Sequence, residues 1–391
     1  MKGKNMDSVL YTLSEHIHGQ NYVIASYYIK LPKEVDVIKK ASTLAVGQTI
    51  GTWIPIPGIT DEIREKYMGK VVNIFDIPAL DLATQIEEEE RKYIIQIAYP
   101  AVNFGNDLPL LITSLLGNDA STSAQVKLLD IEFPEEFTKK FAGPQFGIDG
   151  VREYTKVKGR PFLLNMVKPC TGLTPEEGAK IFYQTALGGV DFIKDDELLG
   201  NPSYSHPADR VKAFRKAAKA AYEESGNHVK YFVNVTSGTA EIMDNVKAVE
   251  DAGADGIMIN FAAVGYSVLK QVAEETNLPI LGHAAGSGMV YEGTLNGMSS
   301  PLAVGKLARL AGADIVMVNT PYGGYPLSYQ KYMQTKHPCL RLAEVFIQEW
   351  WKNISGKSDV ISFWQQAVQY RDIRAERLRE QRQCARQLRL L

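Results

Sequence analysis

The chain has 391 residues, of which 45% are hydrophobic and 23% charged, and its net charge is −2. This length accommodates two domains, and the near-neutral charge gives no indication of binding to nucleic acid or to an anionic membrane. Residues 1–16 contain no apolar core of signal-peptide length, and the chain has no run of 18 apolar residues that would predict a transmembrane helix. The three cysteines are scattered, so we expect a cytoplasmic protein without disulfides.

The sequence pattern of residues 1–150 predicts a smaller α+β domain. Apolar runs indicate strands at 22–31, 70–76 and 92–99, and helices at 35–45 and 108–116. Two motifs stand out here, Thr49–Trp53 and Leu116–Asn118. On their own, both are typical of turns.

Residues 151–335 repeat one plan, in which a strand is followed by a helix. Strands are predicted at 162–168, 190–194, 229–234, 256–260, 279–283 and 315–319. Helices are predicted from 174 onward and at 207–225, 240–252, 266–275 and 301–311. This alternation predicts parallel strands with right-handed crossovers, as in a (β/α)8 barrel, of which six units are recognisable.

Each of the six predicted strands has a polar residue at or near its C-terminal end. These residues are Lys168, Lys194 with Asp196 and Glu197, Asn234, Asn260, His283 and Asn319. Active sites of such barrels lie at this rim. Six consecutive strands with the same feature favour a functional site over chance.

The segment Gly189–Glu197 places a lysine among three carboxylates at the end of an apolar run. Strand alternation points Phe192, Lys194 and Asp196 to one side and Asp195 to the other. A buried lysine beside carboxylates is costly unless it is paired or a metal is bound, and oxygen ligands of this kind suit Mg²⁺. A structural salt-bridge cluster is the alternative interpretation.

Together these motifs resemble the RuBisCO superfamily, and within it the RuBisCO-like proteins that lack carboxylase activity. The motifs are Gly51–Trp53, Gly143–Pro144, Lys168–Leu173, Gly188–Glu197, Asn234–Thr236 and Pro321–Gly324. The resemblance extends from about Tyr22 to about Tyr332. It implies a ferredoxin-like N-terminal domain, a TIM-type (β/α)8 barrel, and a homodimer in which each active site combines one barrel with the partner's N-terminal domain.

The resemblance also implies roles for single residues. Lys194 would be carbamylated by CO₂ and would bind Mg²⁺ together with Asp196 and Glu197. Lys168 matches an acid/base lysine, which we expect to be buried and neutral enough to act. The remaining positions are His283 and Asn118 as catalytic residues, and Thr52, Asn234, Asn319, Gly323 and Gly324 as substrate-binding residues, with Asn118 and Thr52 reaching in from the partner subunit.

Five departures from the family pattern narrow the range of possible activities. Ala284 and Met317 replace phosphate ligands, and Gly324 falls where RuBisCO has the lysine that handles CO₂, so we expect no carboxylation. Asn118 stands where the methylthio-ribose salvage enolases have a lysine, which argues against that substrate. Cys170 replaces a second lysine; it is either an acid/base or nucleophilic thiol or, as we favour, a small apolar filler.

The function that we expect is Mg²⁺-dependent proton abstraction next to a carbonyl, which enolises or isomerises a phosphorylated keto-sugar. Decarboxylation of a phosphorylated 3-oxo sugar acid would use the same site and is an alternative. A further alternative is an inactive remnant or a non-catalytic binding protein.

Residues 336–391 do not continue the family pattern, so the last two βα units are missing or corrupted. The final 21 residues contain seven arginines and no lysine. One interpretation is an exposed basic helix that binds a partner. The other is a frameshift near residues 334–341, because synonymous codons read one base earlier give two glycine-rich loops of the kind that bind phosphate in this family.

Overall fold

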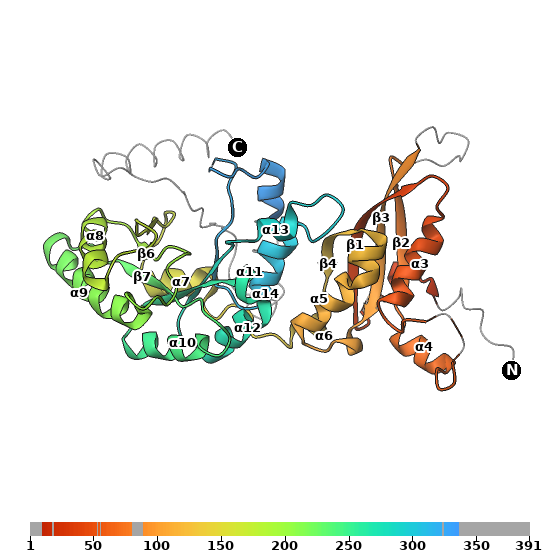
Figure 1. The fold of residues 1–391 in the computed structure, drawn as a ribbon, viewed down its shortest axis with the longest axis horizontal. Helices are drawn as coiled ribbons and strands as arrows, with labels where there is room; N and C mark the ends of the chain where they lie inside the picture. The colour runs from red at the N-terminus through yellow and green to blue at the C-terminus, as the bar shows by residue number, and fades with distance from the viewer. Residues whose placement is uncertain are drawn as a thin grey trace. The chain divides into compact units, whose positions relative to one another are not determined.

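A computed structural model describes residues 10–335, except residues 18, 53, 55, 80–88 and 323. The described residues form two compact units (Figure 1). The first contains the residues before Pro144 together with Gly286–Ala311, and the second contains Pro144–Ala285 with Gly312–Met333. The predicted tail at 336–391 and Gly323 lie outside the described residues.

The first unit is built on an antiparallel sheet with strand order β2-β3-β1-β4. The strands are β1 (Tyr22–Pro32), β2 (Lys70–Ile77), β3 (Glu90–Pro100) and β4 (Lys127–Glu132). Helices α3 (Val37–Gly47) and α5 (Leu108–Leu116) complete a βαββαβ order, and α3 packs against β2 and β3. This connectivity is that of the predicted ferredoxin-like domain.

Short elements complete the first unit, and a strand that the sequence did not indicate closes its sheet. The short elements are α2 (Ser14–Ile17), α4 (Asp61–Tyr67), η2 (Ala101–Asn103), η3 (Asp119–Ala124), α6 (Glu135–Thr138), α13 (Gly288–Tyr291), η4 (Pro301–Lys306) and α14 (Leu307–Leu310). The unpredicted strand is β4, which pairs with β1. Lys306 joins the two parts of the unit, because its ammonium lies 2.6 Å from Asp130 of β4.

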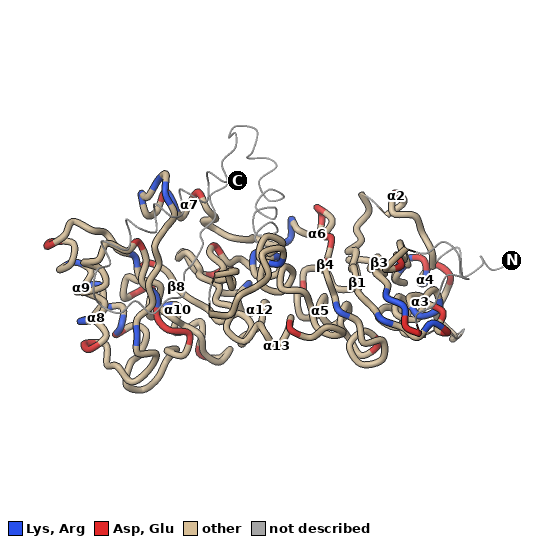
Figure 2. The backbone as a smooth tube through the Cα atoms, turned by 90° about the horizontal axis from the view of Figure 1, so that it is seen from above, with Lys and Arg blue, Asp and Glu red and all other residues tan. Residues whose placement is uncertain are grey.

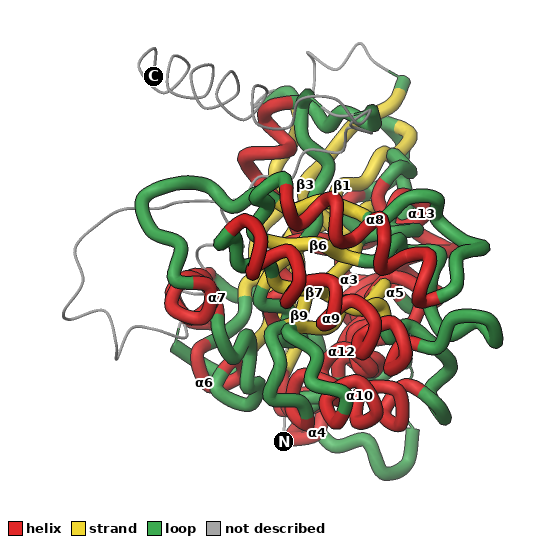
Figure 3. The backbone as a smooth tube through the Cα atoms, turned by 90° about the vertical axis from the view of Figure 1, so that its left-hand side faces the viewer, coloured by secondary structure: helices red, strands yellow, loops and turns green. Residues whose placement is uncertain are grey.

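The second unit contains six parallel strands in sequential order, β5 to β10. They are β5 (Leu164–Met166), β6 (Phe192–Lys194), β7 (Lys230–Asn234), β8 (Gly256–Asn260), β9 (Ile280–His283) and β10 (Ile315–Val316). The helices are α7 (Gly147–Thr155), α8 (Pro175–Leu187), α9 (Pro207–Ser225), α10 (Ile242–Asp251), α11 (Phe261–Val264) and α12 (Tyr266–Glu275). The curled parallel sheet with outer helices agrees with the predicted barrel type (Figure 3).

Local signals fix several of these boundaries. Thr174 caps α8 and forms a capping box with Glu177, and proline opens both α8 and α9. The predicted helix at 301–311 differs in form, because its first part is π-helical. None of the described helices is long and apolar enough to cross a membrane. Lys and Arg are interspersed with Asp and Glu along both units (Figure 2).

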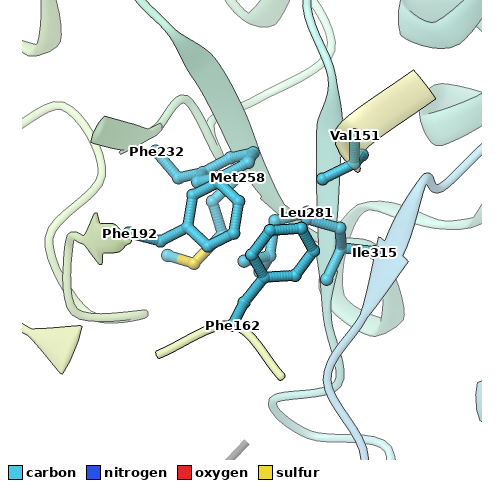
Figure 4. Close-up of a cluster of buried hydrophobic side chains, with 7 residues drawn as sticks. All are labelled: Val151, Phe162, Phe192, Phe232, Met258, Leu281 and Ile315. Carbon is cyan, nitrogen blue, oxygen red and sulfur yellow. The ribbon is translucent and has the colours of Figure 1, made fainter. Parts of the chain in front are cut away.

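A hydrophobic cluster fills the inner side of the parallel sheet (Figure 4). Its buried members are Val151, Phe162, Phe192, Phe232, Met258, Leu281 and Ile315. The Phe192 ring lies 5.0 Å from that of Phe162 and 5.3 Å from that of Phe232. Since strand residues two apart share a face, the residues two positions further along each strand stand directly above this cluster.

Candidate active site at the strand ends

The layer above the hydrophobic cluster is polar. Lys194, Asn234, Asn260 and His283 each come two residues after a cluster member and end β6, β7, β8 and β9. All four are buried. The predicted rim is therefore present, and it rests on a packed apolar floor.

Lys194 is a buried amine with weak partners. Its side chain is 1% exposed. Its Nζ donates to the carbonyl of Asp195 at 3.0 Å and contacts the Met166 sulfur at 3.3 Å. The nearest carboxylate oxygen of Glu197, Oε2, lies 3.8 Å from the Nζ. Burial lowers the pKa of Lys194 to about 8, although the nearby carboxylates oppose this shift. A substantial fraction of the amine is therefore neutral near pH 8.

Asp196 pairs with Lys168 across β5 and β6. The Lys168 Nζ lies 2.6 Å from Asp196 Oδ2 and 2.9 Å from the Cys170 sulfur. Burial alone would raise the pKa of Asp196, but bonds from Lys168 and the Leu198 N–H outweigh it and lower that pKa. Asp196 is thus an ionised, oriented carboxylate.

Lys168 differs from the expectation of a buried, neutral lysine. Its side chain is 46% exposed. Burial would lower the pKa of Lys168, but its bonds to Asp196 and Cys170 raise the pKa well above the usual range. Lys168 therefore holds its proton in this structure. Cys170 is only half-buried and contacts an ammonium, so it is not the apolar filler that we favoured.

The backbone of Glu197 is held by hydrogen bonds, whereas one oxygen of its carboxylate makes no hydrogen bond and is available to a ligand. The carbonyl of Glu197 accepts from the amides of Asn234 at 3.1 Å and Asn260 at 2.8 Å. Its Oε2 is buried and has no hydrogen-bond partner. The Asn234 amide also donates to the Asp196 carbonyl, so both of the Asn234 amide hydrogens are used. Asn234 thus supports this loop through its side-chain amide.

His283 is a neutral imidazole with a defined tautomer. The Ala285 N–H donates to Nδ1 at 3.1 Å, so the ring proton sits on Nε2. Burial and the charge of Lys194 lower the pKa of His283 to about 3. Nε2 lies 3.6 Å from Glu197 Oε2, too far for a hydrogen bond. An N–H donor therefore faces the carboxylate without bonding to it.

The other predicted site residues are spread over both units. Asn319 and Gly324 follow β10 in the second unit, and Gly324 is exposed. Thr52 and the exposed Asn118 lie in the first unit. The segments that carry them follow α3 and α5, and Gln48 joins the ends of these helices by donating to the Ser114 carbonyl at 2.9 Å.

Sequence reasoning missed the supporting residues behind the rim. The sequence pattern does not single out Arg210, and for Asp195 it indicates only that the side chain points away from Lys194. The two form a buried ion pair at 3.0 Å. The signal was available in principle, because an aspartate on the opposite face of a buried strand needs a partner.

Comparison with known proteins identifies two matching family models. The model of the ribulose bisphosphate carboxylase large chain N-terminal domain matches residues 11–137, and the catalytic-domain model matches residues 147–370. The matched range begins before and ends beyond the limits of about Tyr22 and Tyr332 that the motifs indicated.

Individual proteins give the same result. A ribulose bisphosphate carboxylase-like protein of Archaeoglobus fulgidus is 42% identical over 82% of this chain and 74% of its own length. A 2,3-diketo-5-methylthiopentyl-1-phosphate enolase of Geobacillus kaustophilus is 37% identical over 79% of this chain and 75% of its own. A dimeric archaeal Rubisco from Hyperthermus butylicus superposes with a TM-score of 0.73 at 29% identity, covering 83% of this chain and 74% of that one.

Proposed function

This chain belongs to the ribulose bisphosphate carboxylase large chain family, and we propose that it is a RuBisCO-like, Mg²⁺-dependent enzyme that enolises a phosphorylated keto-sugar without carboxylating it. The observation that carries the proposal is the placement of Lys194, Asp196 and Glu197 at the end of β6, opposite Lys168. The enolase relative supports the same chemistry, since its substrate is a phosphorylated diketone by name.

The residues at this strand end fit a magnesium ion. The buried Glu197 Oε2 lacks a hydrogen-bond partner, and Asp196 beside it is ionised. Mg²⁺ prefers such oxygen ligands. Among the described residues, no group of three or more His, Cys, Asp or Glu side chains is arranged to hold a metal. Two carboxylates therefore need a further oxygen donor.

Lys194 would supply that donor after reaction with CO₂. The neutral amine forms an N–C bond to CO₂ and loses one proton, which leaves a carbamate with an anionic oxygen. This reaction requires an uncharged amine, and the lowered pKa of Lys194, about 8, provides one near neutral pH. The poor hydrogen-bond partners of its Nζ fit a group that is modified before it is used.

Around this site, the chain's own residues would bind substrate and move protons. Mg²⁺, when bound, would stabilise the negative charge that develops on the substrate oxygen as the neighbouring carbon loses its proton. Lys168 holds a proton at Nζ and would exchange it with substrate once its bond to Asp196 weakens. His283 would donate a hydrogen bond from Nε2.

The remaining assignments complete a shared site in a homodimer. Thr52 and Asn118 would come from the partner's N-terminal unit, and Asn319, Gly323 and Gly324 would contact the substrate. The dimeric Rubisco that superposes on this chain supports such an assembly. Asn118 lacks the amine that the salvage enolases use, so we propose a phosphorylated keto-sugar other than theirs.

The direct test is proton exchange. Purified protein with Mg²⁺ and bicarbonate is incubated in D₂O with a panel of phosphorylated keto-sugars and with 2,3-diketo-5-methylthiopentyl-1-phosphate. NMR should show deuterium entering the carbon next to a carbonyl, and EDTA should stop it. If no compound exchanges faster than with Lys194→Ala protein, in the chain as written and in a chain with the reading frame corrected after residue 334, the proposed function is wrong. Release of CO₂ from a 3-oxo sugar acid would instead support decarboxylation.

A further inference from the structure

A buried ion pair lies directly behind the proposed metal site. The Asp195 side chain is 0% exposed and that of Arg210 is 1% exposed. Asp195 stands between Lys194 and Asp196 in the chain, and strand alternation turns it away from the rim, toward α9 and β7.

Every oxygen of the Asp195 carboxylate is engaged. Oδ2 accepts from Arg210 Nε at 3.0 Å and from the Asn234 backbone N–H at 2.9 Å. Oδ1 accepts from the Tyr231 hydroxyl at 2.5 Å. The donors come from α9 and β7, so the carboxylate is fixed from two directions.

Arg210 extends the same network to the loop that follows the metal residues. Its guanidinium donates to the carbonyls of Gly200 at 2.8 Å and Leu199 at 3.2 Å, and to that of Ser205. It also donates to the Asn234 carbonyl at 3.2 Å. One planar group thus holds both ends of the loop that begins with Asp196 and Glu197.

From these contacts we propose that Asp195 is a positioning residue for the Mg²⁺ site, acting with Arg210 to set the direction of Lys194, Asp196 and Glu197. Consecutive strand residues point to opposite faces, so fixing one side chain orients its neighbours. Asn234 carries the constraint onward, because its backbone bonds Asp195 while its amide holds the Glu197 carbonyl. The inference rests on the proposed function, since it concerns the same metal site.

The chain contains a matched control for this pair. At the other end of β6, Asp191 is also buried and forms a bidentate pair with Arg160, with both contacts at 2.6 Å. Asp191 also accepts from the Leu163 N–H at 2.8 Å. Both pairs anchor the same strand, but only Asp195 adjoins the metal residues. A purely structural role would give the two aspartates the same effects.

The experiment measures Mg²⁺ affinity by titration calorimetry on the full chain with saturating bicarbonate, at a temperature where each variant is folded. We expect Asp195→Asn to weaken Mg²⁺ binding by roughly 10–100-fold, as is typical when a residue that supports metal ligands is lost. We expect Asp191→Asn to lower the melting temperature but to leave Mg²⁺ affinity within about twofold of wild type.

Equal Mg²⁺ affinity in wild type and Asp195→Asn would overturn the inference, as would equal losses in the two variants. If Asp195→Asn does not fold, Tyr231→Phe removes only one bond to the carboxylate; it should bind Mg²⁺ several-fold more weakly, and unchanged affinity would also overturn the inference. If wild type binds no Mg²⁺ at all, both the proposed function and the inference fail. If wild type binds Mg²⁺ and Asp195→Asn binds it equally well, only the inference fails.

Discussion

Lys168 and Asp196 follow the first two strands of the parallel sheet, β5 and β6, and are joined by a 2.6 Å hydrogen bond. One is the proposed acid/base group and the other a proposed metal ligand. The pairing keeps Lys168 protonated and Asp196 ionised, so each residue is in the charge state that the other favours. A cation that binds the Asp196 carboxylate would weaken this bond and lower the pKa of Lys168, so that its proton is released more easily.

Replacing Lys168 with methionine should remove proton transfer while keeping much of the side-chain volume. We expect the exchange rate to fall about 10²–10⁴-fold, as is usual for loss of a general acid or base. The NMR exchange assay measures it. Lys212→Met is the control, because Lys212 is exposed and, within the described part of the chain, its ion pair is with Asp209 at 3.3 Å. Equal activity in wild type and Lys168→Met would rule out the acid/base role.

Lys194 should govern the response to Mg²⁺ and bicarbonate. A ligand at 100 times its dissociation constant stabilises a folded protein by about 2.7 kcal/mol, so wild-type protein should melt at a higher temperature with both present. Lys194→Ala should lose this shift, because no carbamate can form. Lys230→Ala, which removes a partly buried lysine paired with Asp255 at 2.9 Å, should retain it. The test compares the melting temperatures of wild type and both variants with bicarbonate alone, with Mg²⁺ alone and with both ligands.

The metal-free protein should become more stable as the pH rises through the range set by Lys194. Its pKa is about 8 in the folded chain and 10.5 as the ordinary value. Between these values the unfolded state binds more protons, so the free energy of unfolding increases with pH. Below pH 8 the penalty is constant, at roughly 3 kcal/mol.

Chemical denaturation of wild type and Lys194→Met at several pH values isolates this effect from the ionisation of tyrosines. The free energy of unfolding of the variant minus that of wild type should fall between pH 7 and pH 10. A difference that does not change with pH would show that Lys194 is an ordinary ammonium in the folded chain.

The limits of several helices and strands within the second unit were predictable from the sequence. The predicted ranges of β8, α9 and α12 coincide with the observed ones, because apolar periodicity and capping residues act locally. The positions of Lys194, Asp196 and His283 at strand ends followed from the same periodicity.

What the sequence did not reveal depends on contacts between distant segments. β4 is a charged, alternating strand whose formation relies on pairing with β1, about a hundred residues earlier, so its own composition gave little signal. The exposure of Lys168 and the use of both Asn234 amide hydrogens depend on where other loops fall. The assignment of residues 336–391 to a shifted reading frame stays a prediction.

Sequencing the source gene across codons 325–391 tests that assignment. We expect a single-base correction to restore two glycine-rich loops, and the corrected chain to bind phosphate more tightly than the chain as written. The variants above would then be compared in the corrected chain. If the written frame is confirmed, residues 336–391 do not encode the family's phosphate loops.

His283 gives a test that is independent of metal binding. With a pKa of about 3, its imidazole should stay neutral from pH 5 to pH 8, so its ring NMR signals should not move over this range. The signals are assigned by their loss in His283→Asn, and their ¹⁵N shifts should report a proton on Nε2, since Nδ1 accepts from Ala285. A signal that titrates near pH 6.5 would show that the imidazole gains a proton within this range. Part of the ring population would then be cationic at neutral pH, and the proposal that His283 is a neutral donor throughout the range would have to be given up.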